Sequence, residues 1–322
     1  MENKKAENNK KINIKIIFPS ALAAILSLTL IWTYLIFIPR KTENAATDNG
    51  QKFALLNPAR KLIAQKDLII NIQPLRNELN KFEGNQNISI YFEYLPTGAN
   101  ISINKDAQFW PASLLKVPVT MAVAKKIEKG EWKWDNKLVL MAGDKDEKFG
   151  TLYKEPTGST FTIEELVRRS LKDSDNTANF ILVRNLELKE IEEVYEHIGT
   201  GDFFSSAGDI GAKKYSANLR ALYNSSYLNE GSSQKLLGYL SETEFSEYLK
   251  SGLPENIAFA HKIGIDEERK VYMDSGIVYA SQRPYILTVM ISGKEKKDAQ
   301  EIMKNVSELA FGYVNNYSEN QE

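Results

Sequence analysis

Stretches rich in β-branched and aromatic residues lie near both ends of the chain. Residues 88–94 and 100–104 are two such stretches, joined through a Pro-Thr-Gly turn, and residues 258–265, 271–280 and 285–291 are three more. This composition, bounded by turn residues, is typical of β-strands. Two of these strands precede a long middle region and three follow it. We therefore expect the first two strands and the last three to form one sheet.

The middle of the chain has the three-to-four-residue period of amphipathic helices. Residues 114–129 are apolar nearly all round, which predicts a buried helix that Gly130 ends. Other predicted helices cover residues 55–81, 162–171, 177–185, 187–198, 218–223, 234–250 and 298–314. The element order predicts an α+β fold, a three-layer α/β/α arrangement. In it, a five-stranded antiparallel sheet carries terminal helices and an inserted all-helical lobe.

A membrane anchor is predicted before this domain. Residues 16–38 carry no charge and are almost wholly apolar, which is long enough to cross a bilayer. Residues 1–15 hold five lysines, so they are predicted to be a cytoplasmic tail, with everything after the span outside the plasma membrane. The alternative is a cleaved signal peptide, but no small-x-small site follows at the usual distance. We assign residues 39–67 as linker, 68–316 as the main domain and 317–322 as a tail.

Composition excludes several kinds of chemistry. The chain has 322 residues, a formal net charge of -1, no cysteine and two histidines, His197 and His261. Disulfides, thiol catalysis and zinc-thiolate sites are therefore excluded, and a histidine-rich metal site is not expected. The near-neutral charge argues against nucleic acid as a partner. We expect no metal and no cofactor.

The stretch Ser113-Leu114-Leu115-Lys116 stands at the mouth of the predicted buried helix. Residues three apart share a helix face, so the side chains of Ser113 and Lys116 should be neighbours. A buried lysine has a lowered pKa and can accept a proton, and a hydroxyl beside it becomes a nucleophile. The pattern recurs from Ser102 to Lys105 and from Ser232 to Lys235 in polar surroundings, where we regard it as incidental.

Two further clusters follow in order, Ser174-Asp175-Asn176 and Lys262-Ile263-Gly264. With Ser113-x-x-Lys116, the set resembles the penicillin-recognising serine hydrolases, the class A β-lactamases and penicillin-binding proteins, whose signatures are S-x-x-K, S-D-N and K-T-G. The resemblance covers about residues 68–314. Each cluster alone also has an ordinary interpretation, as a helix cap, a capping turn or a solvated strand lysine. Their joint occurrence favours an active site.

The resemblance implies a role for each residue. Ser113 would be the acylated nucleophile and Lys116 its base. Ser174 would pass a proton to the leaving nitrogen, and Asn176 would hold Lys116 and the substrate amide. Lys262 would attract a substrate carboxylate and lower the pKa of Lys116. Gly264 would let the substrate approach its strand, and the backbone N–H groups of Ser113 and Ile265 would form an oxyanion hole.

The sequence departs from the family pattern at two places. Class A β-lactamases release their acyl-enzyme with a glutamate in a loop after S-D-N, whereas residues 200–214 hold only Asp202 and Asp209 as carboxylates. Ile263 replaces Thr or Ser, so a hydroxyl for the substrate carboxylate is missing. His261 adjoins Lys262 on a strand and should face the other way, so we interpret it as structural.

The sequence therefore predicts a membrane-anchored extracytoplasmic serine hydrolase of the class A β-lactamase type. It would act through an acyl-serine intermediate on β-lactam or D-Ala-D-Ala-like amides, with slow deacylation. Two alternatives stay open, a peptidoglycan D,D-carboxypeptidase or endopeptidase, and a penicillin-binding module without turnover.

Overall fold

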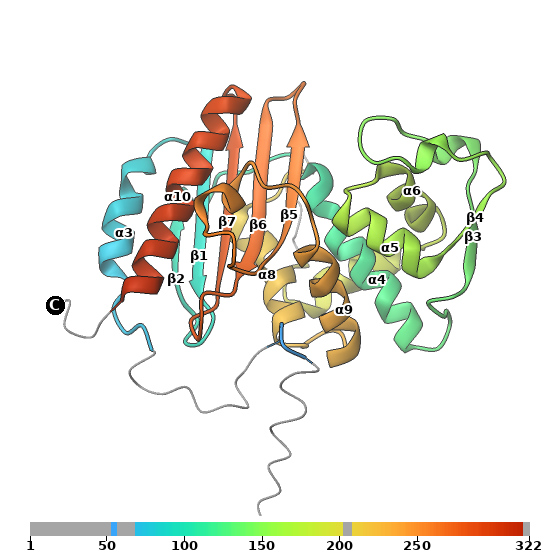
Figure 1. Cartoon of the computed structure of the whole chain (residues 1–322), viewed down its shortest axis with the longest axis horizontal. Helices are drawn as coiled ribbons and strands as arrows, with labels where there is room; N and C mark the ends of the chain where they lie inside the picture. The colour runs from blue at the N-terminus through green and yellow to red at the C-terminus, as the bar shows by residue number, and fades with distance from the viewer. Residues whose placement is uncertain (1–52, 57–67, 202–207, 318–322) are drawn as a thin grey trace, which may run out of the picture. The chain divides into compact units, whose positions relative to one another are not determined.

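The computed structural model describes residues 53–56, 68–201 and 208–317 of the chain. Within these residues, five strands form one antiparallel sheet in the order β2-β1-β7-β6-β5 (Figure 1). The strands are β1 (Ile88–Tyr94), β2 (Ala99–Ile103), β5 (Phe259–Asp266), β6 (Val271–Val278) and β7 (Tyr285–Ser292). The prediction that the two N-terminal strands and the three C-terminal strands form one sheet is confirmed.

The register of the sheet decides which side chains face the active site. In β5, Lys262 pairs with Ser275 of β6, and Ile263 pairs with Asp274. Because successive side chains alternate between faces, Lys262 and Gly264 share one face and His261 and Ile263 the other. Ala260 packs in the core on the first face, whereas Ile263 packs in the core on the second.

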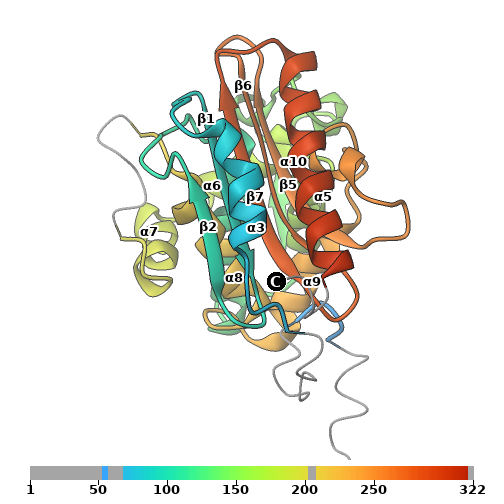
Figure 2. The same ribbon diagram turned by 90° about the vertical axis from the view of Figure 1, so that its left-hand side faces the viewer.

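Two of the helices that the structure describes cover the second face. They are α3 (Gln73–Leu79) and α10 (Lys296–Asn316), which lie side by side in Figures 1 and 2. Apolar residues of α10 such as Met303 and Val306 are fully buried there, together with Ile263. Burial of apolar side chains at about 25 cal/mol per Å² is the main force that holds this layer to the sheet.

The first face packs on the remaining helices. Helix α8 (Ala212–Tyr223) contacts β1, β6 and β7, and the helical lobe follows from it toward β5 (Figure 1). The lobe consists of α4 (Lys116–Glu128), α5 (Ile163–Lys172), α6 (Asn176–Arg184), α7 (Leu188–His197) and α9 (Glu230–Ser241). Helices therefore lie on both faces of the sheet, and the predicted three-layer fold class is confirmed.

Several helices begin at a side chain that accepts a backbone N–H. Thr162 caps α5 through Glu165, Asp175 caps α6 through Ala178, and Asn229 caps α9 through Ser232. Such caps satisfy N–H groups that have no partner within the helix. Short 3₁₀ turns connect the elements: η3 (Asn80–Phe82), η4 (Ala112–Leu115), η5 (Ala142–Asp144), η6 (Leu152–Lys154) and η7 (Leu249–Gly252).

Some boundaries differ from the prediction. Helix α9 runs from Glu230 to Ser241 rather than over residues 234–250, because Asn229 caps it earlier. Helix α8 starts at Ala212 rather than at residue 218. Helix α3 begins only at Gln73, with Pro74 in its first turn, where proline is preorganised for a helix start. The lobe also holds a small hairpin of β3 (Lys137–Val139) and β4 (Thr160–Thr162), so it is not purely helical.

The predicted anchor at 16–38 and the tail at 1–15 lie outside the described residues, as do 318–322 and most of the linker at 39–67. No helix among the residues that the structure describes is both long and apolar enough to cross a bilayer. Residues 53–56 fall within the predicted linker but contact the domain. The Leu55 N–H donates to Gln234 Oε1 at 3.0 Å, and the Leu55 carbonyl accepts from the Tyr279 hydroxyl at 2.8 Å.

Candidate active site

Ser113 lies on the 3₁₀ turn η4, just before α4 begins at Lys116. The turn begins at Ala112, whose φ of 43° is in the left-handed region, and its Leu114 is fully buried. The buried Leu114 fixes the turn on the core, while the half-buried Ser113 lines an open pocket. The turn and the start of α4 thus place Ser113 and Lys116 at the same cavity, as the spacing predicted.

The side chain of Lys116 is 3% exposed and is surrounded by acceptors. Its Nζ donates to Asn176 Oδ1 at 2.6 Å, to Ser174 Oγ at 3.2 Å and to the Ser174 carbonyl. Ser174 has a φ of 55°, and both its hydroxyl and its carbonyl oxygen accept from Lys116. A non-glycine residue in this region costs about 1 to 3 kcal/mol and is frequent where function requires the conformation.

Lys262 reaches the same serine from the sheet. Its Nζ donates to Ser174 Oγ at 2.8 Å and to the Ile263 carbonyl at 3.2 Å, and the residue is 1% exposed. Ser174 therefore lies between two lysines from different layers of the protein. The structure brings together Lys116, Ser174, Asn176 and Lys262, four of the five predicted catalytic residues, by hydrogen bonds, and the fifth, Ser113, shares the pocket with Lys116 and Asn176.

Asp175 holds the Ser174–Asn176 loop in place. One carboxylate oxygen accepts from Ala178 N at 2.9 Å, and the other accepts from Thr151 N at 2.8 Å and Leu152 N at 2.9 Å. Gly150 makes this approach possible, because a Cβ there would collide with the Asp175 carboxylate. The middle residue of the Ser-Asp-Asn cluster is thus structural, and it fixes the two on either side.

The end of β5 closes against the nucleophile turn. A Cβ on Gly264 would lie 3.0 Å from Leu114 Cγ and 3.2 Å from the Pro111 carbonyl oxygen. The absence of a side chain at Gly264 therefore serves the packing of η4 on the strand. Ile265 lines the same pocket as Ser113, and β5 is at the edge of the described sheet, where alternate N–H groups face away from β6. An oxyanion hole from Ser113 and Ile265 remains a prediction.

Burial lowers the pKa of both lysines. The pKa of Lys116 lies well below its ordinary value, first because of burial and then because of the positive charge of Lys262. Burial lowers the pKa of Lys262 from 10.5 to about 7, and the charge of Asp274 acts in the opposite direction. A lysine with a lowered pKa is uncharged for part of the time near neutral pH and can accept a proton. Lys116 therefore has the electrostatic environment of a general base.

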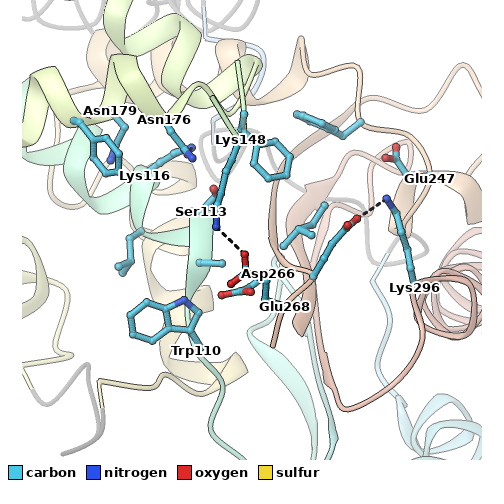
Figure 3. Close-up of a pocket in the computed structure, with 17 residues that line it drawn as sticks. Trp110, Ser113, Lys116, Lys148, Asn176, Asn179, Glu247, Asp266, Glu268 and Lys296 are labelled. Carbon is cyan, nitrogen blue, oxygen red and sulfur yellow. Dashed lines mark hydrogen bonds and ion pairs between the residues drawn. The ribbon is translucent and has the colours of Figure 1, made fainter. Parts of the chain in front are cut away.

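The pocket has a volume of about 700 Å³ and opens to solvent between β5 and the helical lobe. Figure 3 shows Ser113, Lys116 and Asn176 on its lobe side and Asp266, Glu268 and Lys296 toward the sheet. Lys148 crosses from the lobe to Glu268 at 3.2 Å, and Lys296 pairs with Glu267 at 3.0 Å. In the described part of the chain, no group of three or more His, Asp or Glu residues is arranged to hold a metal ion.

Comparison with known proteins agrees with this geometry. Residues 72–314 match the family described as the beta-lactamase enzyme family. The chain belongs to this family. The β-lactamase VEB-1 of Pseudomonas aeruginosa is 23% identical over 254 residues, which are 67% of this chain and 81% of that protein. The chain is a penicillin-recognising serine hydrolase of the class A type.

Solved structures of the same fold extend over most of the domain. PBP-A superposes with a TM-score of 0.70 at 20% identity, over 76% of this chain and 97% of that one. A β-lactamase from Sphaerobacter thermophilus superposes with a TM-score of 0.68 at 20% identity, over 76% of this chain and 98% of that one.

Ile263, where family members carry a hydroxyl, faces away from the pocket. It is 2% exposed and packs in the core between the sheet and α10. A threonine hydroxyl on this backbone would therefore enter the apolar core rather than meet a substrate. The sequence suggested that Ile263 removes a hydroxyl that would bind the substrate carboxylate. The orientation of this side chain does not fit that interpretation.

His261 occupies the same far face, as the strand alternation predicted. Its Nδ1 lies 2.8 Å from Asp274 Oδ1, and both residues are buried. Its ring also stacks on Phe259, with ring centroids 4.1 Å apart. It is a structural residue of the second face and is not among the described residues that line the Ser113 pocket.

Sequence reasoning missed Asp146, which contacts Asn176. The carboxylate lies in a run of charged residues from Asp144 to Lys148, where nothing in the sequence separates it from its neighbours. Only the fold of the loop after η5 brings it to α6, where its Oδ1 accepts from Asn176 Nδ2 at 2.7 Å.

Proposed function

We propose that this protein is a membrane-anchored, extracytoplasmic enzyme that forms an acyl-serine on Ser113. Its substrates would be β-lactams or amides of the D-Ala-D-Ala type, and it would release the acyl group slowly. The observation that carries the proposal is the contact of Lys116 and Lys262 with Ser174 behind a serine that lines an open pocket. This arrangement can take a proton from the nucleophile and return one to a leaving nitrogen.

The chemistry follows from the contacts. Ser113 Oγ would attack the carbonyl carbon as Lys116 takes its proton, and the oxygen of the tetrahedral intermediate would be stabilised by backbone N–H groups. When the C–N bond breaks, the nitrogen needs a proton, which the Ser174 hydroxyl can give while it regains one from a neighbouring ammonium. The product of this step is an ester on Ser113.

Slow release of the ester is supported by the carboxylates around the pocket. Among the described residues, the lining carboxylates are those of Glu247, Asp266, Glu267 and Glu268. Asp266, Glu267 and Glu268 are paired with Arg269, Lys296 and Lys148. Asp209 is not part of this lining, and Asp202 lies outside the described residues. Loss of a well-placed base typically slows a reaction about a hundred- to ten-thousand-fold.

A D,D-peptidase is the second candidate, because it would use the same acylation of Ser113 and needs no base in residues 200–214 for rapid release of the ester. A variant of PBP-A has been solved as an acyl-enzyme with penicillin G. Acylation without rapid hydrolysis fits such an enzyme. It also fits a penicillin-binding module without turnover, so the fate of the ester has to be measured.

The experiment is an intact-mass time course after mixing the soluble domain with excess benzylpenicillin. We expect one adduct that persists for minutes or longer and that is absent from Ser113→Ala. Lack of any adduct on the wild type contradicts the proposal. Clearance within seconds contradicts slow release, and if Asp202→Asn or Asp209→Asn then traps the adduct, that aspartate is the base. Cleavage of an acylated peptide ending in D-Ala-D-Ala identifies the peptidase, and a persistent adduct without cleavage identifies the binding module.

The anchor is tested separately. We propose that residues 16–38 span the membrane with the domain outside, because the lysine-rich flank precedes the span. Protease added to intact cells should remove the domain. Protection until the cells are lysed would show the opposite orientation.

A further inference from the structure

Asp146 is a half-buried carboxylate between η5 and η6, on the lobe side of the pocket. Its Oδ1 accepts from Asn176 Nδ2 at 2.7 Å and from Lys148 N at 2.9 Å. Asn176 in turn accepts from Lys116 through Oδ1 at 2.6 Å. A continuous chain of hydrogen bonds therefore joins the Lys116 ammonium, the Asn176 amide and the Asp146 carboxylate.

The backbone of Asp146 is also fixed to helix α6. Its N–H donates to Thr177 Oγ1 at 3.0 Å, and the same hydroxyl donates to its carbonyl at 3.3 Å. Thr177 follows Asn176 in the first turn of α6 and is fully buried. Asp146 is thus held at two points beside the amide that it contacts, so its carboxylate has little freedom to move away.

The polarity of these groups decides the orientation of the Asn176 amide. A lysine ammonium can only donate, and a carboxylate can only accept. If the amide were turned by 180°, its NH₂ would face the ammonium and its oxygen would face the carboxylate, and both hydrogen bonds would be lost. When Lys116 is uncharged, as acylation requires, its nitrogen can also accept a hydrogen bond, so the contact with Asp146 then decides the orientation of the amide. The Nδ2 group has a second proton, and Asn176 lines the pocket.

We propose that Asp146 is a positioning residue that fixes the Asn176 amide with its oxygen toward Lys116 and its second N–H toward the substrate carbonyl. The inference rests on the proposed acylation of Ser113 and assigns it a residue outside the three sequence clusters. Asp146 acts through Asn176 and does not itself touch the reacting atoms.

The negative charge of Asp146 should affect the pH dependence of acylation, which a residue with only a structural role would leave unchanged. The charged groups that face Lys116 are Lys262 from β5, Asp175 at the start of α6 and Asp146 from the loop, with Lys148 on the pocket wall. Asp146 raises the pKa of Lys116 against the effects of burial and Lys262. Because the base must be uncharged, removal of Asp146 should move the acid limb of the acylation profile to lower pH.

The test is the second-order rate constant for acylation by a fluorescent penicillin, measured from pH 5 to 9. Asp146→Asn keeps the shape but removes the charge and allows the amide to turn, and Asp146→Ala also removes the acceptor. We expect a fall in the plateau rate of about tenfold for Asp146→Asn and about a hundredfold for Asp146→Ala. Both variants should show the same shift of the acid limb. Glu147→Gln, which removes an exposed charge from the next residue, should stay within about twofold of the wild type with no shift.

Circular dichroism gives the folded fraction by which each rate is divided. If Asp146→Ala does not fold, the isosteric Asp146→Asn decides the question alone. A lower rate with an unmoved acid limb, or wild-type behaviour of Asp146→Asn, would overturn the inference while leaving acylation of Ser113 intact. A wild type that is not acylated at all would overturn the proposed function and this inference with it.

Discussion

Lys116 and Lys262 donate to the same atom, the hydroxyl oxygen of Ser174, at 3.2 and 2.8 Å. Two lysines that share one buried acceptor disfavour each other's positive charge, and burial disfavours both. The protein therefore keeps an arrangement that weakens the folded state in order to hold a base near Ser113.

Replacement of Lys262 should stabilise the protein at neutral pH. The folded-state pKa of Lys262 is about 7, against 10.5 ordinarily, so between these values the unfolded chain binds a proton that the folded chain does not. The free energy of unfolding should therefore rise as the pH is raised from 7 to 10.5, and the penalty of burying Lys262 should return as the pH falls toward 7. At pH 7 the penalty is about 3 to 6 kcal/mol. Lys262→Met should remove it, which thermal melts from pH 7 to 9.5 would show.

The matched control is Lys304→Met on α10, whose side chain is half exposed. It should leave both the melting temperature and its pH dependence close to those of the wild type. A Lys262→Met variant that is less stable than the wild type at pH 7 would mean that contacts of Lys262 within the folded protein offset the cost of burying its charge.

Lys116 should be the group that sets the acid limb of acylation. The Lys116→Ala variant should be acylated about a hundred- to ten-thousand-fold more slowly, because general-base assistance is lost. The charge of Lys262 lowers the pKa of Lys116, so Lys262→Met should raise that pKa and move the acid limb to higher pH. Stopped-flow labelling with a fluorescent penicillin across pH measures both effects. An acid limb that Lys262→Met leaves in place would assign it to another group.

Gly264 should tolerate no side chain because of its contact with the nucleophile turn. A Cβ there would lie 2.8 Å from Met273 Cε and 3.0 Å from Leu114 Cγ, so Gly264→Ala should push β5 away from η4. We expect acylation to fall at least tenfold, since a displacement of about 1 Å can cost a hundredfold. Gly238→Ala, in α9 with nothing near its Cβ, should stabilise the protein by about 0.5 to 1 kcal/mol without affecting acylation. Equal acylation of both variants would contradict the packing role.

Ile263→Thr should destabilise the protein rather than improve catalysis. The side chain is buried on the far face, so the new hydroxyl would need a partner within an apolar core. We expect a loss of about 1 to 3 kcal/mol in urea unfolding, against about 1 kcal/mol for Ile263→Val. Acylation per folded molecule should not change. Faster acylation by Ile263→Thr would show that the hydroxyl reaches the substrate after all.

The sequence predicted those features that depend on local pattern. Strand β1 was predicted correctly, because turn residues and a run of buried apolar residues mark it. The helix that carries Lys116 was found for the same reason. The alternation of β5 also predicted that His261 and Lys262 point to opposite faces.

What the sequence could not supply depends on contacts between distant segments. The position of Asp146 follows from its hydrogen bonds to Asn176 and Thr177, which are about thirty residues away. The close packing that requires glycine at position 264 also involves another element, the turn that carries Leu114. Ile263 was interpreted through the family pattern, whereas the same alternation that placed His261 would have placed it in the core.

The place of β7 in the sheet bears on how the protein is made. Strand β7 lies between β1 and β6. Its residue Ile291, near the end of the strand, pairs with Ile88 of β1. Every proposed catalytic residue precedes β6. A nascent chain that stops short of Tyr285 would thus contain the whole catalytic set but lack the strand that connects β5 and β6 to the N-terminal pair. Such long-range pairing is slow to form, so activity would emerge only after almost the entire domain has left the ribosome.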